Sequence, residues 1–329
     1  MKRGLVLGKF MPLHKGHMAL IDFALYRCDE LIVLVSASYD ELISGNKRLE
    51  WIEQTYKGNE QIKPLLLMYD EAVLPNTSAS SEGVSKLWAN YLKGHLPPID
   101  EIFASEAYGA YMGRFLNCDH VIFDEPRKIV PVSATQIRKE PFTYWDFIPD
   151  VVRIYYTLKI CLYGTESTGK TMLAQRLAEH FNTVAVPEMA REILQHTREC
   201  TRAHLLQIAR LQAFTINEKI KQANKLLFVD TDINITRSYS KFLFNEELIV
   251  QEWIEEANKI DLYLYLDTDA PYIQDGTRLN IVDRNGLNES HQQELTGRGI
   301  NYVLIQGEDW DIRFKNATEA VNKFIKINR

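Results

Sequence analysis

Residues 159–181 read KICLYGTESTGKTMLAQRLAEHF. The run KICLY is apolar and strand-like, the next residues carry two glycines, and KTMLAQRLAEHF has the spacing of a helix with one apolar face. Glycines between a strand and a helix let the backbone curl so that its N–H groups point at one spot, at the positive end of the helix. The order strand, glycine turn and helix predicts an α/β fold with a phosphate-binding site at the turn.

The glycine turn fits the pattern G-x-x-x-x-G-K-[S/T]. Gly164 and Gly169 shape the loop, Lys170 is expected to bridge the β- and γ-phosphates, and the Thr171 hydroxyl is expected to bind Mg²⁺. The eight-residue pattern alone can occur by chance in a sequence, but its position between a strand and a helix favours a kinase-type loop. We expect the whole loop to contact ATP: Gly164, Thr165, Glu166, Ser167, Thr168, Gly169, Lys170 and Thr171.

Such a loop needs an acidic residue at the end of a neighbouring strand, for the metal or the attacking hydroxyl. Asp230 follows the apolar run LLFV, and the run VAVP leads to Glu188 and Arg191. The alternative is that these are ordinary solvated turn residues. Further along, Arg278 and Arg284 are candidates for closing over the transferred phosphoryl group, with simple exposure as the alternative.

Outward from this motif, short apolar runs alternate with helical patterns in both halves of the chain. The expected strands are 5–7, 31–36, 64–69, 101–104 and 121–123, then 159–163, 183–186, 226–230, 262–266 and 302–305. The expected helices are 16–27, 47–57, 81–93 and 107–116, then 201–225 and 311–327. This alternation predicts two doubly wound parallel-sheet domains, 1–140 and 158–329, joined by a packed aromatic segment, 141–157. The polar, weakly periodic stretch 270–289 is expected to be disordered or a functional lid.

Composition limits the kinds of partner. The net charge of −6 argues against a general nucleic-acid binder, and no apolar run approaches the length of a membrane span. Four scattered cysteines without a CxxC pair fit a reducing cytoplasm. We therefore expect a cytoplasmic protein with small-molecule partners. The number of subunits stays open, a homo-oligomer included.

The second motif stands at the end of the first expected strand, where residues 8–17 read GKFMPLHKGH. Two histidines three residues apart at a helix start can bind a metal, cap the helix or bind phosphates. The stretch resembles the signature of the HxGH nucleotidyltransferase superfamily. The resemblance implies that His14 and His17 contact the triphosphate of ATP and that Gly16 leaves room for the nucleotide. It also implies that Lys9 and Phe10 line the floor where two substrates meet, and that Gly8 belongs to the ATP-binding residues.

A companion signature follows about 115 residues later, in SATQIR (residues 133–138). It resembles the S/T-x-x-x-R element of the same superfamily. Ser133 is a plausible helix cap, which directs backbone N–H groups and the Thr135 hydroxyl at the β- and γ-phosphates. Arg138 adds charge that strengthens as pyrophosphate departs. Together the two signatures imply in-line transfer of an adenylyl group, with positioning and charge stabilisation supplied by the protein.

Both halves together resemble the bifunctional nicotinamide-nucleotide (NMN) adenylyltransferase/ribosylnicotinamide kinase (NadR) family. The resemblance extends over NKRLEWI, YWDFIPDVVR, VPEMAREIL and DGTR as well as the motifs above. It implies that the second domain phosphorylates nicotinamide riboside and the first joins the product to AMP, giving NAD, with Mg²⁺ accompanying ATP.

The resemblance also implies roles for further residues. Asp230 holds Mg²⁺ or accepts the hydroxyl proton, Glu188 and Arg191 meet the riboside, and Lys9 and Arg48 meet NMN. Trp88 is a candidate for stacking on nicotinamide, with a core position as the alternative. Glu106 and Tyr108 are candidates for the adenosine side. The residues expected to be catalytic are His14, His17, Arg138, Lys170 and Asp230.

Some family members carry an N-terminal helix-turn-helix, and we expect none here because the first strand begins near Met1. Two rival interpretations remain: a phosphopantetheine adenylyltransferase fused to a dephospho-coenzyme A kinase, and a regulator that binds ATP and NAD without turnover.

Overall fold

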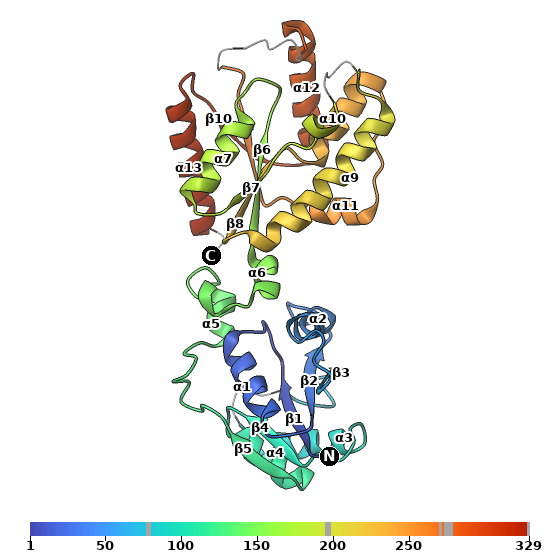
Figure 1. Cartoon of the computed structure of the whole chain (residues 1–329), viewed down its shortest axis with the longest axis vertical. Coiled ribbons are helices and arrows are strands. Elements are labelled where there is room, and N and C mark those ends of the chain that lie inside the picture. The colour runs from blue at the N-terminus through green and yellow to red at the C-terminus, as the bar shows by residue number, and fades with distance from the viewer. Residues whose placement is uncertain (77–79, 195–198, 270–271, 273–278, 328–329) are drawn as a thin grey trace. The chain divides into compact units, whose positions relative to one another are not determined.

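The computed structural model describes residues 1–76, 80–194, 199–269, 272 and 279–327. The chain divides into two compact units, Met1–Tyr155 and Tyr156–Arg329. Each unit is built around its own five-stranded parallel sheet with helices on its faces (Figure 1). The prediction of two parallel α/β sheets is confirmed.

The sheet of the first unit has the strand order β3-β2-β1-β4-β5. Its strands are β1 Arg3–Gly8, β2 Glu30–Ser38, β3 Ile62–Tyr69, β4 Glu101–Ala104 and β5 Asp119–Ile122. The central strands are long apolar runs because helices bury both faces of the sheet, as β2 shows with seven consecutive buried residues. The strand order reverses direction between β1 and β4, which is where sheets of this class bind ligands.

The helices of this unit are α1 Lys15–Leu25, α2 Gly45–Thr55, α3 Glu82–Lys93, α4 Tyr108–Leu116 and α5 Ala134–Lys139. Three of them start where a serine side chain accepts a backbone N–H group: Ser44 at α2, Ser81 at α3 and Ser133 at α5. Apolar residues of α3 and α4 pack against β1, β2 and β4 to form one core cluster.

The aromatic segment expected as a packed connection contains a 3₁₀ turn, Trp145–Phe147, and a short helix, α6 Asp150–Tyr156. Trp145 is buried, and its ring meets that of Phe142 edge-on at 5.5 Å. Residues 141–155 belong to the first unit.

The sheet of the second unit has the order β10-β9-β6-β8-β7. Its strands are β6 Leu158–Tyr163, β7 Val184–Val186, β8 Leu226–Asp230, β9 Leu262–Leu266 and β10 Tyr302–Ile305. Its helices are α7 Lys170–His180, α8 Ala190–Ile193, α9 Arg202–Lys219, α10 Ile233–Phe244, α11 Glu252–Ala257, α12 Ile281–Gly297 and α13 Trp310–Ile327, with a 3₁₀ turn at Ile220–Gln222. The loops after β6 and β8, which are neighbours in the sheet, come together at one edge.

For the stretch 270–289, expected to be disordered or a functional lid, disorder is wrong in the second half, while the lid stays a prediction. Within the stretch 270–289, residues 281–289 are the first half of α12, while most of 270–278 lies outside the described residues. The helix escaped prediction because its buried face carries Arg284, His291 and Glu294 beside Leu287 and Leu295, so no apolar stripe marks it.

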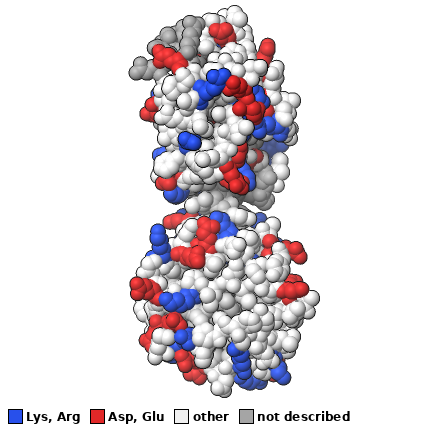
Figure 2. Space-filling view, turned by 90° about the vertical axis from the view of Figure 1, so that its right-hand side faces the viewer, with Lys and Arg blue, Asp and Glu red and all other residues white. Residues whose placement is uncertain are grey.

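The described residues on the face of the molecule in Figure 2 carry no large field of one charge. On the face that Figure 2 presents, basic and acidic side chains are interspersed. No helix among the described residues has the length and apolar character that a membrane crossing requires.

Candidate active sites

The first unit contains a cavity of about 550 Å³ at the carboxyl ends of β1 and β4. Residues of both sequence signatures line it, among them Gly8, Lys9, Phe10, His14, Gly16, His17, Thr135 and Arg138. Ser133 does not line the cavity. Instead, its hydroxyl accepts the backbone N–H of Gln136, and the Gln136 side chain accepts the N–H of Ser133. Ser133 therefore fixes the start of α5, which positions Thr135 and Arg138.

The two histidines are held by the backbone at the start of α1. Nδ1 of His14 accepts the N–H groups of Gly16 and His17, at 3.1 and 3.3 Å, and Nδ1 of His17 accepts the N–H of His14 at 3.3 Å. The rings stack with centroids 3.7 Å apart. Because each Nδ1 is an acceptor, a neutral ring carries its proton on Nε2. The pair therefore offers N–H donors rather than metal-binding lone pairs at Nε2.

Burial keeps these rings neutral. It lowers the pKa of His14 to about 3, with a further contribution from the positive charge of Arg127. The pKa of His17 is also well below its ordinary value because of burial, the neighbouring His14 and Arg127. Two neutral hydrogen-bond donors beside a cationic side chain are suited to a polyphosphate.

Arg138 connects the two signatures. Its guanidinium donates to the carbonyl oxygen of Met11 and, at 3.1 Å, to the Thr135 hydroxyl. Residues 127 positions apart in the chain are thereby joined at the cavity wall. The fold has brought together two elements that the sequence could only pair by resemblance.

Arg127 is a cavity residue that sequence reasoning missed. It lies in a turn whose backbone N–H groups, those of Lys128, Ile129 and Val130, all point at the Asp124 carboxylate. Its guanidinium pairs with Glu106 at 3.1 Å, and both side chains are about half exposed. The left-handed backbone of Asp124 and Arg127, with φ of 44° and 52°, gave no signal in the sequence.

Arg48 does not reach this cavity, which corrects the expectation that it meets NMN directly. Its side chain is fully buried and donates to the carbonyl oxygens of Lys9, at 2.9 Å, of Ser36, at 3.2 Å, and of Ser44. It also pairs with Glu41, whose other oxygen accepts Lys9 Nζ at 2.6 Å. Burial alone would raise the pKa of Glu41, but the hydrogen bonds and charges of Lys9 and Arg48 outweigh it and lower that pKa. Arg48 thus supports Lys9 in two ways, by a hydrogen bond to the Lys9 carbonyl and through the shared partner Glu41.

The opposite wall of the cavity is aromatic. Trp88 and Tyr108 both line it. Trp88 donates to the carbonyl of Pro75 and packs edge-on against Tyr69, while the Tyr108 hydroxyl donates to the carbonyl of Leu7 at 2.7 Å. Trp88 is therefore a core residue that also exposes part of its ring to the cavity. Glu106 lines the cavity as well.

The second unit contains a cavity of about 380 Å³ around the loop between β6 and α7. Of the expected loop residues, all line this cavity except Thr165, which is buried. Gly164 and Gly169 have φ of +134° and +84°, values that favour glycine. Lys170 Nζ donates to the carbonyl of Thr165 at 2.8 Å, so the lysine lies along the loop that it is expected to serve.

Asp230 lies beneath this cavity rather than in its wall. Its Oδ2 accepts the Thr171 hydroxyl at 2.5 Å, while Oδ1 has no hydrogen-bond partner among the described residues. Burial raises the pKa of Asp230 to about 6, the charge of Glu188 adds to this, and Lys170 opposes it. A buried carboxylate oxygen without a partner beside a threonine hydroxyl suits Mg²⁺, which prefers oxygen ligands and takes few from protein when phosphates supply the rest. No cluster of three or more potential metal ligands occurs in the described part of the chain.

Glu188 and Arg191 also line the cavity. They pair through Arg191 Nε and Glu188 Oε2 at 3.1 Å, and the Glu188 side chain is about one-fifth exposed. Gln212 holds this region by accepting the N–H of Met189 and donating to the carbonyls of Asp230 and Thr231. Glu188 is therefore exposed to the cavity, whereas Asp230 is buried beneath it.

Of the two arginines expected to close over the phosphoryl group, only Arg284 can be placed. Arg278 lies outside the described residues. Arg284 is buried in α12 and does not line the cavity; its Nε donates to the carbonyl of Glu166 at 3.0 Å. The Glu166 carboxylate also accepts the Tyr239 hydroxyl at 3.0 Å and the N–H of Leu279 at 3.1 Å. Arg284 and Glu166 thus attach the loop to α10 and α12.

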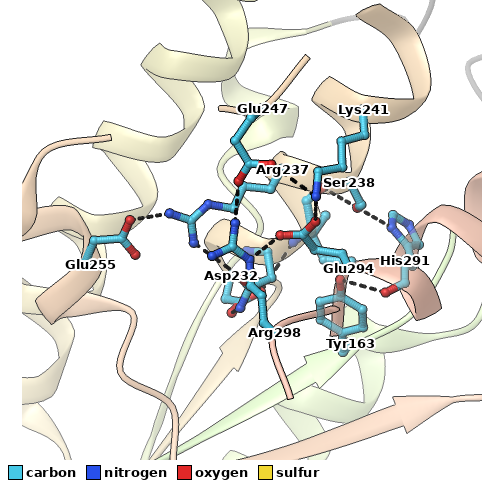
Figure 3. A network of polar contacts seen from close by, with 12 residues as sticks. Tyr163, Asp232, Arg237, Ser238, Lys241, Glu247, Glu255, His291, Glu294 and Arg298 are labelled. Carbon is cyan, nitrogen blue, oxygen red and sulfur yellow. Dashed lines mark hydrogen bonds and ion pairs between the residues drawn. The ribbon is translucent and has the colours of Figure 1, made fainter. Parts of the chain in front are cut away.

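His291 of α12 is a second cavity residue that sequence reasoning missed. Its Nδ1 lies 2.5 Å from the Ser238 hydroxyl, which itself donates to the carbonyl of Ile235. Figure 3 shows this contact inside a polar network between α10 and α12, in which Glu294 is held by Lys241 and Arg298. Burial and the charge of Lys170 keep the pKa of His291 well below its ordinary value. His291 is therefore a neutral, fixed side chain at the cavity wall.

Asp232, two residues beyond Asp230, has a structural role. It caps α10 by accepting the N–H groups of Asn234 and Ile235, and it accepts the Tyr263 hydroxyl at 2.6 Å. Burial raises its pKa to about 6 despite these hydrogen bonds.

The comparisons with known proteins agree with this division of the chain. A cytidylyltransferase-like family matches residues 5–68, and an AAA domain family matches residues 159–313. The chain is 31% identical over 351 residues to the trifunctional NAD biosynthesis/regulator protein NadR of Escherichia coli, covering 99% of this chain and 84% of that protein. The chain belongs to the NadR family.

Two further matches bear on the units. The nicotinamide-nucleotide adenylyltransferase of Thermococcus onnurineus is 25% identical over 142 residues, which cover 42% of this chain and 71% of that protein. A crystal structure of NadR protein in complex with NAD and AMP-PNP has the same fold, with a TM-score of 0.77 at 23% identity over 99% of this chain and 96% of that one. The predicted family resemblance and fold are confirmed.

Proposed function

We propose that the chain makes NAD from nicotinamide riboside in two ATP-consuming steps, one in each unit. The second unit phosphorylates the riboside to NMN, and the first joins NMN to the AMP part of a second ATP. The observation that carries the proposal is that each unit has its own cavity lined with phosphate-directed groups: His14, His17 and Arg138 in one, the 164–171 loop in the other. Membership of the NadR family supports both activities.

In the first unit, an oxygen of the NMN phosphate attacks the α-phosphorus of ATP. The bond from that phosphorus to the bridging oxygen breaks, and pyrophosphate leaves. The Nε2–H groups of His14 and His17, together with Arg127 and Arg138, bind the triphosphate and the departing pyrophosphate. Lys9, braced by Arg48 and Glu41, meets the NMN phosphate. Trp88 supplies an apolar face for the nicotinamide ring.

In the second unit, the 5′-hydroxyl oxygen of the riboside attacks the γ-phosphorus, and ADP leaves. Lys170 and the N–H groups of the loop hold the phosphates. Thr171 and Asp230 would hold Mg²⁺, which neutralises triphosphate charge when bound. Glu188, exposed to the cavity, is better placed than the buried Asp230 to accept the hydroxyl proton. Arg191 orients Glu188.

The assay feeds the protein Mg-ATP with nicotinamide riboside, NMN or phosphopantetheine and measures NAD, pyrophosphate and ADP. Lys170→Ala is expected to abolish NAD formation from the riboside and to spare it from NMN. His17→Ala is expected to abolish NAD formation from both substrates and to spare phosphorylation of the riboside, so that NMN accumulates. The exposed residues Lys323 and His95, changed to alanine, are matched controls and should leave both activities unchanged.

The outcomes separate this proposal from its rivals. NAD formed from NMN but not from the riboside removes the kinase step, and turnover with phosphopantetheine alone favours the coenzyme A alternative. Binding of ATP and NAD without turnover favours a regulator. Loss of both activities in one folded variant contradicts the two-site scheme.

We place these reactions in the cytoplasm, without nucleic-acid or membrane partners. All four cysteines are free thiols, and the chain is acidic, with basic and acidic side chains interspersed on the face in Figure 2. Either a monomer or a homo-oligomer is compatible with two sites that each lie within one unit.

A further inference from the structure

Trp310 packs directly on the phosphate-binding loop of the second unit. A Cβ atom built on Gly169 would overlap the six-membered ring of this tryptophan, lying 2.8 Å from its Cη2. Trp310 opens α13, which follows β10, and β9 lies between β10 and the loop-bearing strand β6. Because carboxyl ends of parallel strands meet at one edge, the start of α13 comes beside the loop.

The ring is nevertheless not buried. Trp310 is 44% exposed, and Met172, which lines the cavity from the first turn of α7, is 67% exposed. Met172 is two residues past Lys170, and Gly169 lines the same cavity. Two exposed apolar side chains, Met172 and Trp310, thus lie near the end of the loop, Trp310 against Gly169 and Met172 three residues further on; we call this pair the apolar shelf. Burying such a shelf under a flat apolar group is favourable.

The shelf rests on a rigid base. Arg313, fully buried one turn into α13, donates to the carbonyl of Thr168 in the loop at 2.8 Å, to that of Asp267 at 2.9 Å and to that of Gly307 at 2.5 Å. It also pairs with Asp269. Loop, strand end and helix start are thereby joined into one piece. On the outer side, Arg176 of α7 pairs with Asp311 of α13 at 2.8 Å.

We propose that Trp310 and Met172 bind the purine base of the nucleotide whose phosphates lie on the 164–171 loop. This inference deepens the proposed function and rests on it. A nucleotide held by its phosphates must direct its base along the surface next to the loop. The half-exposed indole is the aromatic platform beside Gly169, and stacking on it favours any purine over a smaller pyrimidine.

The test measures inhibition constants in the riboside kinase assay, which reports on this site alone. Trp310→Ala is expected to raise the inhibition constant of ADP, and the KM for ATP, about tenfold, a typical effect of losing one stacked base. The inhibition constant of inorganic tripolyphosphate, which has no base, should stay within about twofold. Trp310→Phe should restore most of the ADP affinity. Trp253→Ala, which removes another tryptophan of similar exposure, 41%, from α11, is the matched control and should change nothing.

Equal weakening of ADP and tripolyphosphate would show that Trp310 only supports the loop, and no weakening of either would exclude contact with the base. Both results overturn the inference.

A wild-type protein that does not phosphorylate the riboside would instead remove the proposed function. The inference is then decided by hydrogen exchange of residues 164–172. ADP should protect them in the wild type, and Trp310→Ala should need about ten times more ADP for the same protection. Equal ADP requirements would overturn it.

Discussion

Replacing Arg48 by methionine tests whether the buried pair with Glu41 stabilises the floor of the adenylyl-transfer cavity. The substitution keeps most of the side-chain volume but removes hydrogen bonds to three carbonyls and the charge that faces Glu41. Arg48 is fully buried and the Glu41 side chain is 8% exposed, so solvent cannot replace the lost partner. Breaking a buried pair on one side typically costs about 3–5 kcal/mol. We expect that loss in the free energy of unfolding of the first unit.

The double variant Glu41→Gln/Arg48→Met separates the pair from its surroundings. Because removing both charges leaves none of them buried alone, its cost should be at least about 1.5 kcal/mol smaller than the sum of the single costs. Lys47→Met, an exposed neighbour on α2 that pairs with Glu50 on the surface, is the control and should stay within about 0.5 kcal/mol.

Native-state hydrogen exchange with mass spectrometry gives these free energies from peptides of β1 and β2, with β6 and β8 of the second unit as internal reference. Adenylyl transfer from ATP to NMN should fall about tenfold or more, because Lys9 loses its brace, while riboside phosphorylation stays unchanged. Additive single costs, or an equal loss of protection in β6 and β8, would refute the reasoning.

Three further results are expected. Riboside phosphorylation should fall about tenfold per pH unit below pH 6, because the pKa of Asp230 is raised to about 6 and its protonated form cannot hold Mg²⁺; a flat profile between pH 5 and 7 contradicts this. Asp230→Asn should abolish the kinase step yet stabilise the second unit at pH 7.5, because a carboxylate with a raised pKa costs stability above that pKa. Denaturant unfolding should show a smaller gain in stability at pH 5 than at pH 7.5. Arg127→Ala should raise the KM for ATP in adenylyl transfer about tenfold without lowering the melting temperature, because its side chain is about half exposed and its ion pair with Glu106 is exposed as well; an unchanged KM would remove Arg127 from the ATP site.

The sequence was most informative where local chemistry decides the structure. Strands such as β2 and β8 are largely apolar. In the loop 164–169, glycines stand where the backbone has positive φ. Both the strands and the loop could therefore be predicted within a few residues. Arg48 was misjudged because a charged residue on an amphipathic helix normally faces solvent, whereas here the helix turns it onto three carbonyls.

Arg127 and His291 had no local signal. Arg127 reaches the first cavity only through a left-handed turn built around Asp124. His291 reaches the second because α12 buries a polar face against Ser238. Tertiary contacts decide both positions, and the periodicity of the chain does not record them.

The motif G-x-x-x-x-G-K-[S/T] allows any residue at four positions, yet in this chain the side chains at three of them make specific hydrogen bonds. Thr165 donates to the carbonyl of Arg284, Thr168 donates to the carbonyl of Thr165, and Glu166 accepts from Tyr239 and Leu279. A loop transplanted from another nucleotide-binding protein would satisfy the pattern and still bind phosphate. It would, however, lose the attachment of α10 and α12, and with it the placement of His291. The glycines and the lysine of the motif can thus be exchanged between proteins, whereas residues 165, 166 and 168 make contacts that are specific to this one.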